Sequence, residues 1–151
     1  MQHKIYSILF QGFVSILLCI GHVSAQSNLV GNWEGSITVE RDGEVLNSFK
    51  MLLIISSDSV EVTGQSWVWY KEQKAVFSFK GQFEKELLKI KDVELLEFDK
   101  LASGEWCFKN MELLFSENRK YAKLEGAWTG HTTFSSCQPG RIALKKIMKR
   151  A

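Results

Sequence analysis

The sequence predicts an all-β protein: an eight-stranded antiparallel up-and-down barrel that follows a cleaved N-terminal signal peptide. Two observations carry the prediction of the barrel. Apolar and polar residues alternate with a period of two between turn residues spaced about 8 to 16 positions apart, and no stretch of 12 or more residues keeps a helical period. Consecutive antiparallel strands joined by short loops can close into a barrel, which leaves no edge strand exposed. A Greek-key sandwich of similar strand count is the structural alternative.

The chain opens with the three-part pattern of a secretory signal peptide. A short basic region precedes an apolar run, 5–20, and small residues precede the expected cleavage after Ala25. The alternative, a retained membrane anchor, needs about 20 apolar residues flanked by charge. This run has polar interruptions, and no charge follows it until Glu34. We therefore expect residues 1–25 to be removed and residues 26–151 to form one domain that is secreted or periplasmic.

The composition of the mature chain excludes some classes of partner. Lys4 is the one charged residue that leaves with the signal, out of 19 basic and 17 acidic residues, so the remaining charge is close to zero. Near-neutrality gives no argument for a nucleic-acid partner. A membrane-spanning barrel needs an apolar outer face, and the outward positions of the predicted strands are polar. We expect no nucleic-acid partner and no membrane span after signal cleavage.

The first two predicted strands show the alternation most clearly. Residues 29–40 place Trp33 and other apolar or small residues on one face and mostly charged or hydroxyl residues on the other. Residues 41–43, Arg-Asp-Gly, form a three-residue hairpin loop with glycine at the position that requires positive φ. The second strand, 45–55, keeps the inward parity, and residues 56–59 make the next turn.

The third strand, 60–70, is predicted to change its inward parity along its length. Val62 faces inward near the start, whereas Trp67 and Trp69 are the large apolar residues near the end. Their positions differ in parity, and one extra residue in the strand is the simplest way to point all of them inward. We therefore predict a β-bulge at residues 64–66.

The fourth and fifth strands follow after a turn at the end of the third. Residues 75–83 alternate phenylalanines, Phe77 among them, with polar residues. Residues 87–98 begin with Leu88 inward and then change parity, so that Val93 faces inward. A second irregularity is therefore expected in the fifth strand.

The last three strands complete the predicted barrel. The sixth strand, 105–115, begins with Trp106 and Phe108 inward and changes parity further along, and the seventh, 120–128, ends with Trp128 inward. The final connection and strand cover residues 129–140 and 141–148.

The start of the first strand carries a recognisable motif. Gly31-Asn32-Trp33 is a Gly-x-Trp sequence, and with the strand pattern it resembles the calycin superfamily, the lipocalin-like barrels, particularly their short bacterial secreted members. The resemblance covers the whole mature chain and implies a barrel whose narrow end is plugged by Trp33. The family usually sets an arginine beside this tryptophan, and the candidates here are Lys149 and Arg150.

Two cysteines remain after signal cleavage, Cys107 and Cys137. Export permits oxidation, so an even cysteine count favours a disulfide, and two free buried thiols are the alternative. Hairpin register places both residues at the same end of the barrel. We therefore predict a bridge between them.

The longer loops identify the end of the barrel at which a ligand would enter. Alternate loops of an up-and-down barrel share one end, and the long connections fall together there, as expected of an open mouth. Four aromatic residues near this end would surround a small apolar cavity, and a histidine and an arginine at the rim would orient a carboxylate or a carbonyl. The loops that share this end are 41–44, 71–74, 99–104 and 129–140. The predicted ligand-binding residues are Trp69, Phe77, Trp106, Trp128, His131 and Arg141.

The sequence does not favour catalysis, a cofactor or a bound metal. The mature chain has one histidine, His131, and it lacks phosphate-binding and metal-binding motifs. Paired carboxylates such as Asp92 and Glu94 are interpreted as solvating charge on the strand surface. The sequence predicts a non-catalytic protein that binds a small apolar or amphipathic molecule. The alternative is an inhibitor-type module that binds a protein or cell-wall partner and has a filled barrel core.

Overall fold

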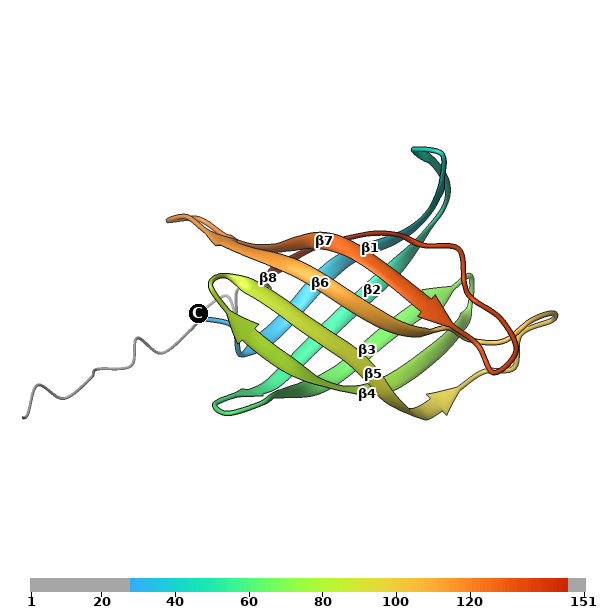
Figure 1. Ribbon diagram of the computed structural model, residues 1–151, viewed down its shortest axis with the longest axis horizontal. Coiled ribbons are helices and arrows are strands. Elements are labelled where there is room, and N and C mark those ends of the chain that lie inside the picture. The colour runs from blue at the N-terminus through green and yellow to red at the C-terminus, as the bar shows by residue number, and fades with distance from the viewer. Residues whose placement is uncertain (1–27, 147–151) are drawn as a thin grey trace, which may run out of the picture.

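The structure is a computed structural model in which residues 28–146 are described. Eight antiparallel strands pair in chain order, and β1 pairs with β8 to close a barrel (Figure 1). The predicted up-and-down barrel is confirmed, and the sandwich is excluded. The expected cleavage after Ala25 and the candidates Lys149 and Arg150 lie outside the described residues. The strands are β1 (Gly31–Arg41), β2 (Glu44–Asp58), β3 (Val62–Tyr70), β4 (Gln73–Glu84), β5 (Leu87–Phe98), β6 (Phe108–Glu117), β7 (Ala122–His131) and β8 (Gly140–Lys146).

The core fills the barrel because apolar side chains at alternate positions point inward. Each large aliphatic or aromatic side chain buried there stabilises the fold by about 1.5–3 kcal/mol. Within residues 28–146 no helix is long and apolar enough to cross a membrane. The buried inner-face residues include Trp33, Ile37, Met51, Leu53, Leu88, Met111, Leu113, Leu124, Ile142 and Leu144.

Trp33 closes one end of the barrel. Its side chain is fully buried, and its Nε1 donates a hydrogen bond to the Leu29 carbonyl oxygen at 2.8 Å. Lys146, its partner on β8, holds its Nζ 5.7 Å from the indole centroid. A cation therefore lies over Trp33, and it comes from β8 itself.

The first hairpin differs slightly from the prediction. Arg41 pairs with Glu44, so the loop has two residues, Asp42 and Gly43, and not three. Both have positive φ, 53° and 83°. This is the combination of a type I′ turn, whose twist matches that of the flanking strands.

The predicted parity change in β3 is wrong. The β3–β4 ladder runs without interruption from Val62 to Tyr70, so Ser66 and Val68 share the inner face with Val62, and the tryptophans of this strand point outward. The bulge lies instead in β2, between Ile55 and Ser57. On this strand the largest apolar side chains therefore point outward, and small or polar residues point inward.

Small residues, Gly64 and Ser66, occupy the middle of the inner face of β3, because a larger side chain at Gly64 would have no room. A Cβ atom on Gly64 would come within 2.7 Å of the Phe79 ring and 1.9 Å of the Ile54 carbonyl oxygen. Ser66 is fully buried and donates a hydrogen bond to Asp92. The space inside the barrel at this level is already filled from β4 and β5.

The displaced tryptophans form a covered pair on the outer face. The rings of Trp67 and Trp69 stack with centroids 5.9 Å apart. Lys74 lies over Trp67 at 5.3 Å, and Lys50 lies over Trp69 at 5.2 Å. Lysine side chains pack their apolar stems on such rings and keep their charge in water, so these indoles are tolerated outside the core.

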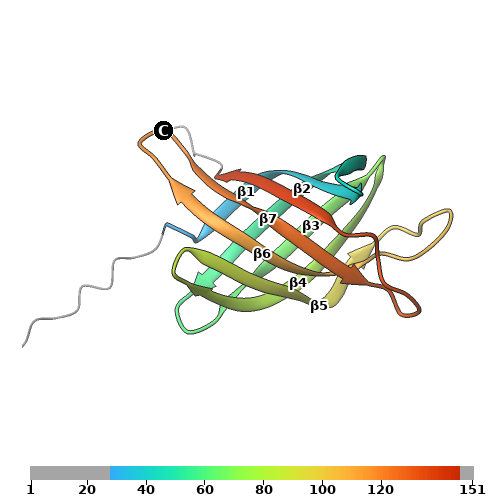
Figure 2. The ribbon, with the colours of Figure 1, turned by 45° about the horizontal axis from the view of Figure 1, so that its top comes forward.

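β5 carries the irregularity that opens the barrel toward its mouth. Its pairing with β4 shifts register twice, at Val93 and at Leu96, and Asp92 faces inward where Val93 was predicted. Its pairing with β6 stops at Lys91, opposite Asn110. Beyond this point β5 follows β4 alone, and the long connection 99–107 begins (Figure 2).

Candidate functional site

A cavity of about 400 Å³ lies at the mouth of the barrel. The connection 99–107 supplies one side of it, and residues of β1, β2, β3, β4, β6 and β7 and of the β3–β4 turn supply the rest. The two long connections within residues 28–146, which are 99–107 and 132–139, lie at this end (Figure 1). The apolar wall comprises Ile37, Val39, Phe49, Val68, Leu101, Ala102, Trp106 and Trp128.

Two of the six predicted ligand-binding residues contribute to this wall. Trp106 lies just before β6, and its Nε1 donates to the Asp99 carbonyl oxygen at 2.8 Å. Trp128 lies on β7, and its Nε1 donates to the Thr38 carbonyl oxygen at 2.8 Å. Because backbone carbonyls take up both N–H groups, these indoles offer the cavity only apolar surface.

The other four predicted residues do not line the cavity. Phe77 is buried below it, and the predicted inward orientation of Trp69 is wrong, because this side chain lies on the outer face of β3. His131 is exposed at the end of β7, with its ring 6.0 Å from that of Phe108. Arg141 is exposed on the outer face of β8.

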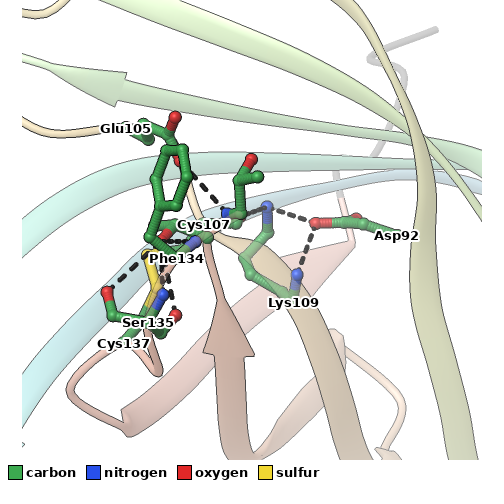
Figure 3. Close-up of a disulfide and its surroundings, with 9 residues drawn as sticks. Asp92, Glu105, Cys107, Lys109, Phe134, Ser135 and Cys137 are labelled. Carbon is green, nitrogen blue, oxygen red and sulfur yellow. Dashed lines mark hydrogen bonds and ion pairs between the residues drawn. A yellow bond between two sulfur atoms is a disulfide. The ribbon is translucent and has the colours of Figure 1, made fainter.

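The floor of the cavity holds a buried ion pair that the sequence reasoning missed. Lys109 Nζ lies 2.5 Å from Asp92 Oδ2, and the two side chains are 3% and 0% exposed (Figure 3). The interpretation of Asp92 as solvating surface charge is therefore wrong. Lys109 precedes the inward-facing Met111 by two residues, so the alternation along β6 places it on the inner face. The alternation in the sequence could therefore have identified Lys109 as an inward residue. Lys109, and not Phe108, occupies that buried position.

The ion pair forms where the β5–β6 ladder ends. Lys109 has no backbone partner on β5, and its main-chain N–H donates to Asp92 Oδ2 at 2.9 Å. Ser66 Oγ donates to Asp92 Oδ1 at 2.9 Å. The carboxylate thus replaces a missing strand partner and is itself fully hydrogen-bonded, as a buried charge requires.

The Lys109 ammonium has three contacts of unequal quality. Besides Asp92, Nζ lies 3.8 Å from the Phe77 ring centroid and 3.5 Å from the Cys107 carbonyl oxygen. Burial lowers the pKa of Lys109, and the charge and hydrogen bond of Asp92 oppose that change. The Lys109 amino group therefore lies in a largely apolar setting at the base of the cavity, where Asp92 is its charged partner.

The predicted disulfide between Cys107 and Cys137 is confirmed, with a Cα–Cα distance of 6.4 Å. It joins the two long connections beside the cavity (Figure 3). Glu105 Oε2 also accepts a hydrogen bond from the Thr133 backbone N–H at 3.1 Å. These links hold the mouth together, and the disulfide is consistent with an extracytoplasmic location.

The rim carries charges of both signs. Lys71 begins the β3–β4 turn in a left-handed conformation, with φ of 56°, and lines the cavity with Gln73. Glu105 lines the opposite connection. The rim therefore has no strong preference for a ligand of one charge.

Comparison with protein-family models, curated proteins and solved structures gives no match. Among residues 28–146, no group of three or more histidine, cysteine, aspartate or glutamate side chains is placed to hold a metal ion. The geometry of the mouth is therefore the basis for assigning a function.

Proposed function

We propose that this protein is a secreted or periplasmic, non-catalytic barrel that binds a small apolar or amphipathic molecule in its mouth cavity. The observation that carries the proposal is the cavity of about 400 Å³ with its predominantly apolar wall. Cavities of this size and character are typical of small-molecule sites. A barrel of eight strands can instead fill with its own side chains, and here the filled core stops below the mouth.

The closed end of the barrel supports the resemblance to lipocalin-like proteins. Trp33 plugs it, and Lys146 places a cation over the indole. In this family an arginine usually holds that place. The proposal of membership rests on this pair and on the strand order.

Replacing Trp128 by alanine is expected to weaken binding of the neutral dye N-phenyl-1-naphthylamine by about tenfold. Trp128 is 5% exposed, so the indole acts mainly by building the cavity wall that holds the ligand, and its removal leaves that wall incomplete. A tenfold change in affinity corresponds to about 1.4 kcal/mol. Fluorescence titration measures the dissociation constant, and circular dichroism checks that the variant is folded.

Trp69→Ala is the matched control for this experiment. It removes the same side chain from the outer face of β3, and dye binding should stay as in the wild type. Equal affinities for the dye in the wild type and both variants would argue against the mouth cavity as the binding site.

One observation favours the interaction module as a second candidate function. Phe134 is 86% exposed at the tip of the connection 132–139. Thr132 Oγ1 accepts hydrogen bonds from the Phe134 and Ser135 backbone N–H groups, and the disulfide at Cys137 anchors the segment. A rigidly held, exposed aromatic residue is a common anchor in protein interfaces.

Phe134→Ser is expected to weaken binding of an interface partner by more than tenfold, since anchor residues often contribute 2 kcal/mol or more. Chemical crosslinking in the native extracytoplasmic fraction measures the adduct with the partner. Dye binding in the mouth cavity provides the control and should not change. Equal crosslinking of wild type and variant would contradict this role for Phe134.

A further inference from the structure

We propose that the ligand is an apolar molecule with a neutral carbonyl group, whose oxygen accepts a hydrogen bond from Lys109 Nζ at the cavity floor. This inference rests on the proposed binding function and specifies its ligand class. The hydrogen-bonding groups at the wall and floor of the cavity, and the partners that each of them already has, support this assignment.

The cavity wall offers no free N–H group from its two indoles. Trp106 donates to Asp99 and Trp128 donates to Thr38, each at 2.8 Å. An indole N–H has a single hydrogen to donate. The two indoles therefore present only apolar surface to the ligand. The other polar side chains that line the cavity, Tyr70, Lys71, Gln73, Ser103 and Glu105, lie toward its open end, and Lys109 is the polar side chain at the floor.

Both oxygens of the Asp92 carboxylate already accept hydrogen bonds, and Asp92 itself does not line the cavity. Oδ1 accepts from Ser66 Oγ, and Oδ2 accepts from both the backbone N–H and the Nζ of Lys109. A ligand hydroxyl or amine that approached it would compete with bonds of 2.9 Å or shorter. The floor therefore disfavours ligands that donate hydrogen bonds.

Lys109 can donate one hydrogen bond to a ligand. An ammonium group has three donors and no acceptor. Nζ donates to Asp92 and lies 3.8 Å from the Phe77 ring centroid, and its remaining contact, with the Cys107 carbonyl oxygen at 3.5 Å, is at the limit for a hydrogen bond. Lys109 and Cys107 both line the cavity, so a ligand oxygen at ordinary distance would replace the weakest of the three contacts.

The charge balance favours a neutral acceptor over a carboxylate. Lys109 and Asp92 together carry no net charge. A ligand carboxylate would add a second anion beside the buried Asp92, and an excess buried charge is costly. A ketone, aldehyde or ester oxygen accepts the same hydrogen bond without adding charge.

The test compares four ligands of equal chain length that displace N-phenyl-1-naphthylamine: decane, 2-decanone, 2-decanol and decanoate. In Lys109→Met the affinity for 2-decanone relative to decane should fall about tenfold, because methionine cannot donate a hydrogen bond to the carbonyl oxygen, and tenfold corresponds to about 1.4 kcal/mol. The wild type should also prefer 2-decanone to decanoate and to 2-decanol, whose hydroxyl group brings a donor to this floor. Lys91→Met, an exposed neighbour on β5, is the control and should keep the wild-type ratio.

A second arm uses the wild-type protein alone, so that it does not depend on the folding of a variant. The uncharged Nζ of Lys109 attacks the carbonyl carbon of decanal, and water leaves to give an imine. Borohydride then supplies hydride to the imine carbon, solvent supplies a proton to the nitrogen, and the product is a stable secondary amine. Burial lowers the pKa of Lys109, which raises the fraction of uncharged amine near pH 8. Peptide mapping should find the adduct on Lys109 ahead of exposed lysines.

The outcomes separate this inference from the function on which it rests. If none of the four ligands displaces the dye, the proposed binding function fails. If decane displaces it while Lys109→Met leaves the ratio unchanged and decanal gives no adduct on Lys109, the carbonyl assignment fails and the binding function stands. Tighter binding of decanoate than of 2-decanone would also overturn the assignment.

Discussion

Asp92→Ala is expected to lower the free energy of unfolding by about 3–5 kcal/mol, the usual cost of breaking a buried ion pair by removing one partner. The substitution leaves the Lys109 ammonium in an apolar interior without its counter-ion. It also leaves the Lys109 backbone N–H and the Ser66 hydroxyl without their hydrogen-bond acceptor, because both donate to this carboxylate. Urea unfolding under non-reducing conditions, followed by tryptophan fluorescence, measures the loss.

Glu94→Ala is the matched control, because the same strand carries this carboxylate on its exposed face. Exposed substitutions usually change stability by less than about 0.5 kcal/mol. A loss for Asp92→Ala as small as that for Glu94→Ala would show that Asp92 is solvated, and the buried pair would then have to be abandoned.

The double substitution Cys107→Ser with Cys137→Ser is expected to cost about 3–4 kcal/mol. The bridge spans 30 residues, and in the chain-entropy account a closed loop of this length stabilises the fold by that amount, because it restricts the unfolded chain. Replacing both cysteines avoids a free thiol. Urea unfolding of the variant and of the oxidised wild type gives the difference.

The wild type under reducing conditions is the control for the serine side chains themselves. It should lose nearly the same stability as the double variant, since both lack the crosslink. A difference below about 1 kcal/mol between oxidised and reduced wild type would contradict the expected role of the bridge.

The alternation of apolar and polar residues was sufficient to predict the strands and most of the core. On β1 and β8 one face is buried and the other is exposed to solvent. The alternation of residues therefore predicts directly that Trp33, Ile37 and Leu144 point inward. The position of the disulfide followed from the same register, because consecutive hairpins send alternate loops to the same end. These features depend on local pattern and on chain connectivity.

The orientation of β3 could not be predicted in the same way. Hydrophobicity pointed Trp67 and Trp69 inward, but the volume inside the barrel depends on the opposite strands. Phe79 fills the space beside Gly64, and the outer lysines cover the tryptophans. The choice between the two faces of this strand was therefore made by packing between strands.

The sequence by itself determined the order of the strands, the end that carries the long loops and the pairing of the cysteines, because these follow from periodicity and connectivity. Only the tertiary structure decided the chemistry of the cavity floor. Asp92 and Lys109 are 17 residues apart and look like ordinary surface charges, and Ser66 is 26 residues from Asp92. They meet because β5 leaves β6 after Lys91, and the N–H group exposed there needs a buried acceptor that no local pattern reveals.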